Sequence, residues 1–164
     1  MTPTHQAALT VAQESFATFA EALTGLPDEA LAWRPAARNT NSLAVLAAHS
    51  ISATRFWLAN GAGAGKTFEE YRRVDRGPAF SVAGGASEDF RAQFDVPLSD
   101  VATLFASGTE AHLAAEVAQP GDPDMTRSGV GCLIHGIGHL REHAGQAQLM
   151  RDLWLGRDAE VTRG

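Results

Sequence analysis

Three histidines recur at four-residue intervals near the C-terminal end of the chain, and they constrain the fold more than any other feature. His135, His139 and His143 lie in a segment rich in apolar residues. Side chains four residues apart lie one turn above another on an α-helix. At about 100° per residue, the three imidazoles share one side of the helix with Leu140 and Trp154. Burying neutral ring nitrogens costs free energy without a partner, and a divalent metal is a suitable one. The sequence therefore predicts a metalloprotein.

Spacing alone leaves an alternative open for each histidine. A single histidine on an apolar face is more often a packed or solvated side chain than a metal ligand. A pair four residues apart is stronger evidence, because both imidazoles can reach one ion at about 2.1 Å.

Length, charge and cysteine content limit the possible classes. The chain has 164 residues, of which 45% are hydrophobic, so we expect one globular domain over residues 1–164. A net charge of −6 with few clustered basic residues argues against nucleic acid as a partner. Cys132 is the only cysteine, which excludes an intrachain disulfide and a thiolate-rich zinc cluster. Any metal must be held mainly by nitrogen and oxygen.

The N-terminal residues lack the pattern of a signal peptide, and no stretch has the roughly 18 consecutive apolar residues of a membrane helix. We therefore expect a cytoplasmic protein that does not span a membrane.

Helical periodicity dominates the chain, and no stretch shows the alternation of a convincing β-strand. Apolar residues at three- and four-residue spacing predict long helices over residues 4–23, 42–60, 99–117 and 128–155, with a short helix over 87–94. Residues 28–41 are expected to form a connector, and the glycine-rich residues 61–86 a long crossover. This order predicts an all-α four-helix bundle with a long crossover between helices two and three. Such a bundle can bring His49, in the second helix, close to His139 and His143.

Three stretches of the chain resemble a known family. The segment HLREHAGQ, from His139 to Gln146, carries two histidines followed by a Gly-Gln step, and residues 43–57 place a histidine before an aromatic pair. The connector LPDEALAWRP, residues 26–35, adds to the similarity. Together they resemble the DinB/YfiT-like superfamily of metal-binding four-helix bundles, over most of the chain.

The resemblance implies that one histidine of the second helix and two of the last bind a divalent ion. In this sequence these are His49, His139 and His143. Three imidazoles with an open position resemble a catalytic zinc arrangement. We expect zinc or nickel, with iron or manganese as alternatives, because imidazole discriminates weakly among late first-row ions. His135, one turn before the matched motif, is a candidate catalytic residue that faces the substrate or supports a ligand.

The resemblance also implies a use for the metal, because several members of the superfamily are thiol S-transferases that activate bacillithiol, mycothiol or a similar cofactor. We therefore expect metal-dependent transfer of a low-molecular-weight thiol to a small electrophile. Gln146, near His143, is a second candidate catalytic residue that would orient a ligand or water. Arginine or glutamine side chains near the mouth of the cleft would bind carboxylates of the thiol.

Two other classes of function stay open. The metal could serve a stress-associated binding or interaction module without catalysis, or it could activate water in a metal-dependent hydrolase. Cys132 lies two turns before His139, about 10 Å along a helix axis, so we expect a buried structural thiol there. Helical bundles commonly pair through exposed apolar faces, so we also expect a homodimer.

Overall fold

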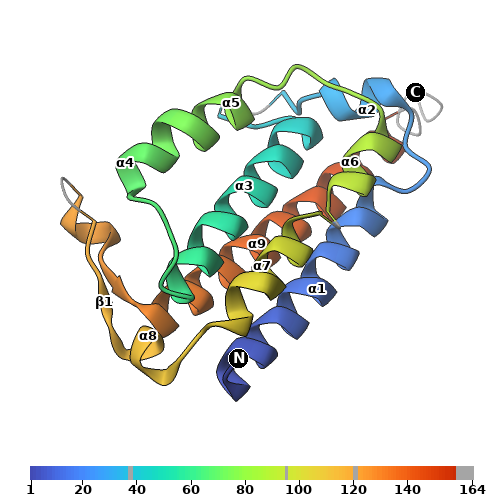
Figure 1. Ribbon diagram of the computed structural model, residues 1–164. Helices are drawn as coiled ribbons and strands as arrows, with labels where there is room; N and C mark the ends of the chain where they lie inside the picture. Colours follow the sequence, from blue (N-terminus) through green and yellow to red (C-terminus); the bar gives the residue numbers. More distant parts are fainter. Residues whose placement is uncertain (37–38, 95, 120–121, 158–164) are drawn as a thin grey trace.

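The computed structural model is an all-α bundle (Figure 1). It describes residues 1–36, 39–94, 96–119 and 122–157. In these residues, no helix is both long enough and apolar enough to cross a membrane. The frame of the bundle consists of the long helices α1 (Pro3–Leu23), α3 (Leu43–Gly61), α7 (Val96–Ala106) and α9 (Gly129–Gly156). The longest of them, α9, packs against both α1 and α3, so it is central to the bundle.

Hydroxyl side chains begin three of these helices. Thr2, Ser42 and Ser128 have extended backbones, and each side chain accepts a hydrogen bond from the N–H group three residues later. Such a bond satisfies one of the free N–H groups in the first helical turn and stabilises the helix by about 1 kcal/mol. The caps explain why the first, second and fourth predicted helices begin within one residue of α1, α3 and α9.

The third predicted helix is wrong in its extent. We expected one helix over residues 99–117, but α7 ends at Ala106. A short helix, α8 (Glu110–Ala114), and two short strands, β1 (Glu116–Val117) and β2 (Arg127–Ser128), follow before α9. The strands pair antiparallel, and a 3-10 turn, η2 (Pro123–Met125), lies between them. Strands of two residues are too short to produce a visible alternation in the sequence.

Gly108 and Thr109 explain why the helix breaks. The backbone of Gly108 lies against the imidazole of His5, where a Cβ atom at residue 108 would come within 2.6 Å of Cε1. That imidazole is fully buried, and its Nε2 lies 3.3 Å from the carbonyl oxygen of Gly61. Thr109 begins a new helix, because its hydroxyl accepts from the N–H of His112. The glycine and the capping threonine thus end one helix and begin another, although the apolar residues continue at helical spacing through this segment.

Helical turns also occupy the connections that we expected to be irregular. The connector contains α2 (Asp28–Ala32), and the crossover contains α4 (Phe68–Tyr71), the π-helical turn η1 (Arg72–Arg76) and α5 (Gly77–Phe80). The predicted short helix is present as α6 (Ser87–Gln93). In the crossover, α5 packs on α3, and the ring of Phe80 lies 4.6 Å from that of His49. The crossover therefore covers the side of α3 that carries this histidine.

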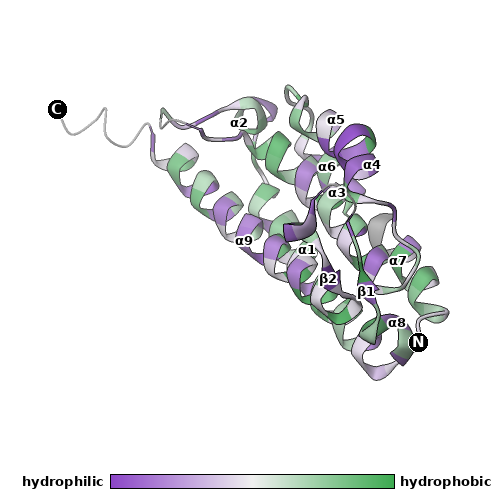
Figure 2. Cartoon of the chain, turned by 90° about the vertical axis from the view of Figure 1, so that its left-hand side faces the viewer, coloured by the Kyte–Doolittle hydropathy of each residue, from purple (hydrophilic) through white to green (hydrophobic). Residues whose placement is uncertain are grey.

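The apolar faces of α1, α3 and α9 enclose the main core. Phe16 and Phe19 of α1 are buried there with Leu140 of α9. Phe56 and Trp57 of α3 are buried in a neighbouring cluster. Figure 2 shows hydrophilic and hydrophobic residues alternating along α9. This burial, at about 25 cal/mol per Å² of apolar surface, aligns α9 against α3.

Candidate metal centre

Close packing of α3 against α9 determines where their histidines meet. A Cβ atom at Gly136 would lie 2.7 Å from Cβ of Trp57, so only glycine allows the two helices to approach at this point. His139 comes three residues after Gly136 on α9, and His143 lies one further turn along. His49 lies on the facing side of α3, two turns before Trp57. The contact between the helices thus brings the three imidazoles together.

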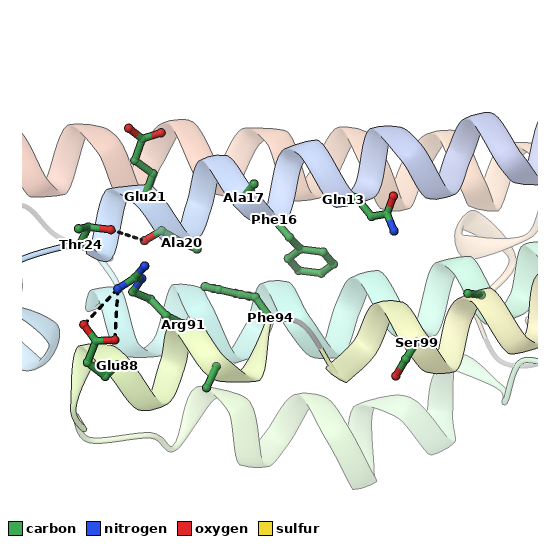
Figure 3. A pocket seen from close by; sticks show the side chains of 12 residues that line it. Gln13, Phe16, Ala17, Ala20, Glu21, Thr24, Glu88, Arg91, Phe94 and Ser99 are labelled. Carbon is green, nitrogen blue, oxygen red and sulfur yellow. Dashed lines mark hydrogen bonds and ion pairs between the residues drawn. The ribbon is translucent and has the colours of Figure 1, made fainter.

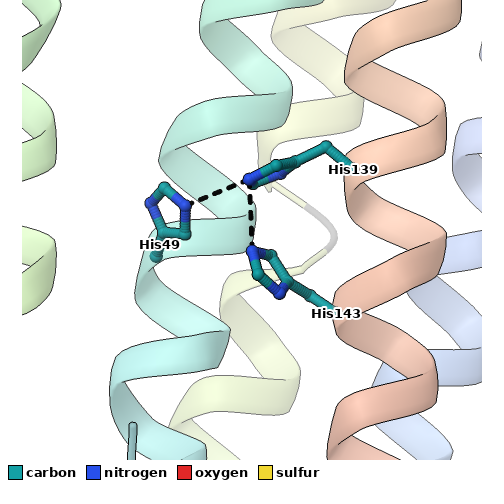
Figure 4. Close-up of side chains that lie close together, drawn as sticks. All are labelled: His49, His139 and His143. Atoms are coloured by element: carbon teal, nitrogen blue, oxygen red, sulfur yellow. Dashed lines mark hydrogen bonds between the residues drawn. The ribbon is translucent and has the colours of Figure 1, made fainter. Parts of the chain in front are cut away.

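The three imidazoles point their ring nitrogens at one another (Figure 4). Nε2 of His139 lies 3.2 Å from Nε2 of His49 and 3.1 Å from Nε2 of His143. One ring nitrogen from each histidine lies within 4.8 Å of the other two. Two nitrogens that bind one ion tetrahedrally at about 2.1 Å lie about 3.4 Å apart, so this separation fits a shared divalent cation.

Gln146 and Glu142 orient one of the three rings. Nδ1 of His143 donates to Oε1 of Gln146 at 2.8 Å, and Nε2 of Gln146 donates to Oε1 of Glu142 at 3.3 Å. A neutral imidazole with its proton on Nδ1 carries a lone pair on Nε2. The chain of hydrogen bonds therefore points a ligating lone pair of His143 toward His139. Support of this kind behind a ligand is a usual feature of histidine metal sites.

The other two rings are held in their neutral, ligating form. Burial, followed by the nearby charges of His139, His143 and Arg76, lowers the pKa of His49 to about 3. Burial and the neighbouring histidines lower the pKa of His139 to about 4. Nδ1 of each ring is buried and has no hydrogen-bond partner among the described residues. Both imidazoles are therefore neutral near pH 7, as metal coordination requires.

His135 lies outside the three-histidine cluster. Its ring packs against Trp57 at 4.5 Å between centroids, and its Nδ1 is 3.4 Å from a guanidinium nitrogen of Arg127. A guanidinium can only donate, so Nδ1 accepts and the proton of the neutral ring lies on Nε2. The centroid of His135 is 6.2 Å from that of His139. This histidine is therefore placed beside the cluster, with an N–H that a ligand could use.

Cys132 is fully buried, as expected of a structural thiol. Burial raises its pKa to about 11. The thiol is therefore neutral near pH 7, and it is absent from the histidine cluster.

The crossover contributes residues that sequence reasoning did not assign to the site. The guanidinium of Arg76 lies 4.5 Å from the centroid of Phe80, which in turn packs on His49. Among the described residues, no carboxylate pairs with Arg76. Two sequence signals predict a helix in this crossover. Thr67 can cap a helix, and Phe68 and Tyr71 are three residues apart.

A separate hollow in the described part of the molecule lies away from these histidines. It measures about 1040 Å³ and runs between α1 and the segment of α6 and α7 (Figure 3). Some of its polar side chains are engaged locally, with Arg91 paired to Glu88 and the Thr24 hydroxyl bonded to the Ala20 carbonyl. No histidine lines it, so it is separate from the candidate metal centre.

The fold and the site together define a class of protein: all-α bundles with a candidate metal centre between facing helices. A model of the DinB superfamily matches residues 12–147 of this chain. The chain therefore belongs to the DinB superfamily, which confirms the resemblance in its sequence.

Solved structures support the fold. The mycothiol-dependent maleylpyruvate isomerase superposes with a TM-score of 0.61 at 14% sequence identity, covering 88% of this chain and 62% of that chain. A histidine-to-alanine mutant of the isomerase superposes with a TM-score of 0.60 over the same shares of both chains, also at 14% identity. This chain thus spans less than two thirds of the isomerase. No curated protein sequence matches it.

Proposed function

We propose that this protein is a metal-dependent thiol S-transferase, which joins a low-molecular-weight thiol to a small electrophile. The observation that carries the proposal is the convergence of ring nitrogens from His49, His139 and His143, which are held as neutral ligands between two helices. Membership of the DinB superfamily supports it, and so does the likeness of the fold to an enzyme whose name includes mycothiol dependence.

His49, His139 and His143 would hold a divalent ion, with zinc or nickel preferred and iron or manganese as alternatives. When bound, such an ion supplies Lewis acidity that favours the thiolate form of a thiol at neutral pH. Three protein ligands leave a coordination position for an exogenous ligand. The chain's own cysteine is unsuited to replace that thiol, because Cys132 is buried and its pKa is raised.

The surrounding side chains would bind and orient the reactants. Arg76, which has no carboxylate partner in the described part of the chain, would bind a carboxylate of the thiol. His135 would donate from Nε2 to the substrate. Gln146 is a positioning residue, because it acts through His143. In the transfer, a sulfur–carbon bond forms, the leaving group departs with the electrons of the bond that breaks, and the thiol proton passes to solvent.

Cobalt substitution tests this function. The purified chain is first analysed for metal, then reconstituted with Co²⁺ and titrated with mycothiol, bacillithiol and glutathione. We expect one thiol to produce a saturable sulfur-to-cobalt charge-transfer band and to support conversion of 1-chloro-2,4-dinitrobenzene, with release of chloride. His139→Ala should lose the band, whereas His112→Ala, outside the cluster, should keep it.

Other outcomes would favour the remaining classes. Turnover of an ester or amide without any thiol would identify a hydrolase. A cobalt spectrum that no thiol perturbs, together with no turnover, would identify a binding module without catalysis. Either result would overturn the thiol-transferase proposal.

We also propose that the chain forms a homodimer. Ile134 is 67% exposed on α9, and Val130, one turn earlier, is 36% exposed. Two copies that meet there would bury this apolar surface. Light scattering after gel filtration should give the mass of two chains, and Ile134→Asp should reduce it to one; a wild-type monomer would contradict the proposal.

A further inference from the structure

A cavity of about 460 Å³ shares a wall with the candidate metal centre. His143 and Gln146 form that wall, and the cavity continues along the C-terminal half of α9. Its volume falls within the roughly 300–1,000 Å³ that is usual for small-molecule pockets. Because His143 belongs to both the cluster and the cavity, a molecule in the cavity would lie next to whatever the histidines bind.

The floor and one side of the cavity are apolar. Leu46 of α3 and Met150 of α9 are only 3% and 7% exposed, and they form a closed apolar base. Leu149 and Leu153 line the same cavity but are 59% and 47% exposed. Exposed leucines beside a concave surface favour an apolar ligand, since removing their apolar surface from water is favourable.

The opposite rim is polar and braced by its own hydrogen bond. Asn39, Thr40 and Asn41 come from the connector between α2 and α3. Asn39 has a left-handed backbone with φ of 61°, a conformation that asparagine tolerates better than most residues. The hydroxyl of Thr40 donates to the carbonyl of Pro35 at 3.0 Å, which holds the rim in place. Amide side chains there can hydrogen-bond a carbonyl or hydroxyl group of a ligand.

Charge distinguishes this cavity from the rest of the site. Among the described residues that line it there is no aspartate, glutamate, lysine or arginine. Arg127, by contrast, lies beside His135, toward the other end of α9. A charged ligand would lose hydration free energy against this lining, and an ion held by the three histidines would lie only at the wall formed by His143. The described lining away from that wall is therefore suited to a neutral compound.

We propose that this cavity is the binding pocket for the electrophile, and that the substrate is an uncharged, apolar carbonyl or aryl compound. Its role as an electrophile pocket rests on the thiol-transferase function proposed above. Binding itself needs no thiol, so the two proposals can fail separately.

A matched pair of unreactive probes tests the inference. The neutral ketone 4-phenylbutan-2-one and the anion 3-phenylpropanoate have nearly the same shape and differ in charge. Each is titrated into the metal-free full-length chain, so that the carboxylate cannot bind an ion at the histidines, and binding is followed by calorimetry and by the NMR shifts of leucine methyl groups. We expect the ketone to bind with a dissociation constant at least tenfold lower than that of the anion, and to shift the methyl signals of Leu149 and Leu153.

Two exposed leucines of α9 provide the variant and its control. Leu153→Asp should weaken binding of the ketone at least tenfold, because it places a carboxylate in the cavity. Leu155→Asp should change it less than twofold, because Leu155 is 55% exposed and does not line the cavity. Circular dichroism checks that both variants are folded.

Four outcomes would overturn the inference: no saturable ketone binding, equal binding of both probes, equal effects of the two substitutions, or a wild-type dimer that Leu153→Asp alone dissociates. The last would assign this surface to a second copy of the chain. If ketone binding fails while thiols still perturb the cobalt spectrum, the electrophile pocket is wrong and the thiol-transferase function stands. Ketone binding without any thiol effect would support a pocket for neutral ligands but not thiol transfer.

Discussion

The six histidines of the chain have the same side chain and different surroundings, and the surroundings decide what each can do. The ring of His5 is fully buried, with Thr2 and the Gly61 carbonyl near its two nitrogens, so its capacity for hydrogen bonds is already used. His49 and His139 have low pKa values and converge on a shared centre. In this chain, an imidazole can serve as a metal ligand where the ring nitrogens of other histidines lie close to its own.

Removing one ligand should therefore remove the metal. His139→Ala takes away the nitrogen that lies within 3.2 Å of both partner nitrogens, and we expect the metal content per chain to fall to about one tenth or less. Elemental analysis after dialysis measures this. His112→Ala is the control, because His112 lies outside the cluster. Equal loss of metal from both variants would contradict the assignment.

Gln146 tests whether the hydrogen bond behind His143 matters. Gln146→Leu removes the acceptor of the His143 Nδ1 proton, and we expect metal affinity to fall by about 10- to 100-fold. Competition with a chromophoric chelator measures the affinity. Gln148→Leu, an exposed position two residues along α9, should leave it unchanged. An unaffected Gln146→Leu variant would mean that the ring is oriented by packing alone.

At the scale of elements, two glycines on α9 have opposite roles. A Cβ atom at Gly136 would meet Trp57, whereas a Cβ atom at Gly138 would meet nothing within 4 Å. We expect Gly136→Ala to destabilise the fold by about 1–3 kcal/mol through overpacking and to weaken metal binding as α9 moves from α3. Gly138→Ala should stabilise the fold by about 0.5–1 kcal/mol, because alanine favours helix. Urea unfolding measures both, and equal effects would exclude a tight contact at Gly136.

At the scale of the whole molecule, the buried histidines link stability to pH. The pKa of His49 is about 3 and that of His139 about 4 in the folded chain, compared with 6.5 for an unperturbed histidine. Below pH 6.5 the unfolded chain therefore binds more protons than the folded one. The contribution to stability is complete above pH 6.5 and is lost as the pH falls toward 4 and then 3.

We expect the free energy of unfolding of the metal-free protein to fall on acidification by up to about 1.4 kcal/mol per pH unit for each group. Urea unfolding between about pH 7.5 and 4.5 measures this slope. His49→Gln should show a smaller slope, and the difference isolates His49 from the carboxylates. Identical slopes would contradict the low pKa.

The long helices, the bundle and the candidate ligands could be predicted from the order of residues alone. Caps and apolar spacing are local signals, so α1, α3 and α9 could be predicted to within a residue or so at each end. The four-residue spacing of His139 and His143 identified one half of the candidate site, and the family resemblance identified His49 as the other.

The remaining features depend on packing between distant segments, and such contacts leave no local pattern in the sequence. The close approach at Gly136, the helical crossover that brings Phe80 onto His49, and the break at Gly108 against His5 each depend on a partner elsewhere in the chain. The low pKa values of His49 and His139 also depend on distant partners, because their rings are desolvated only once the helices have packed. Helix spacing gave each imidazole a direction, and packing of α3 against α9 brought them to a common point.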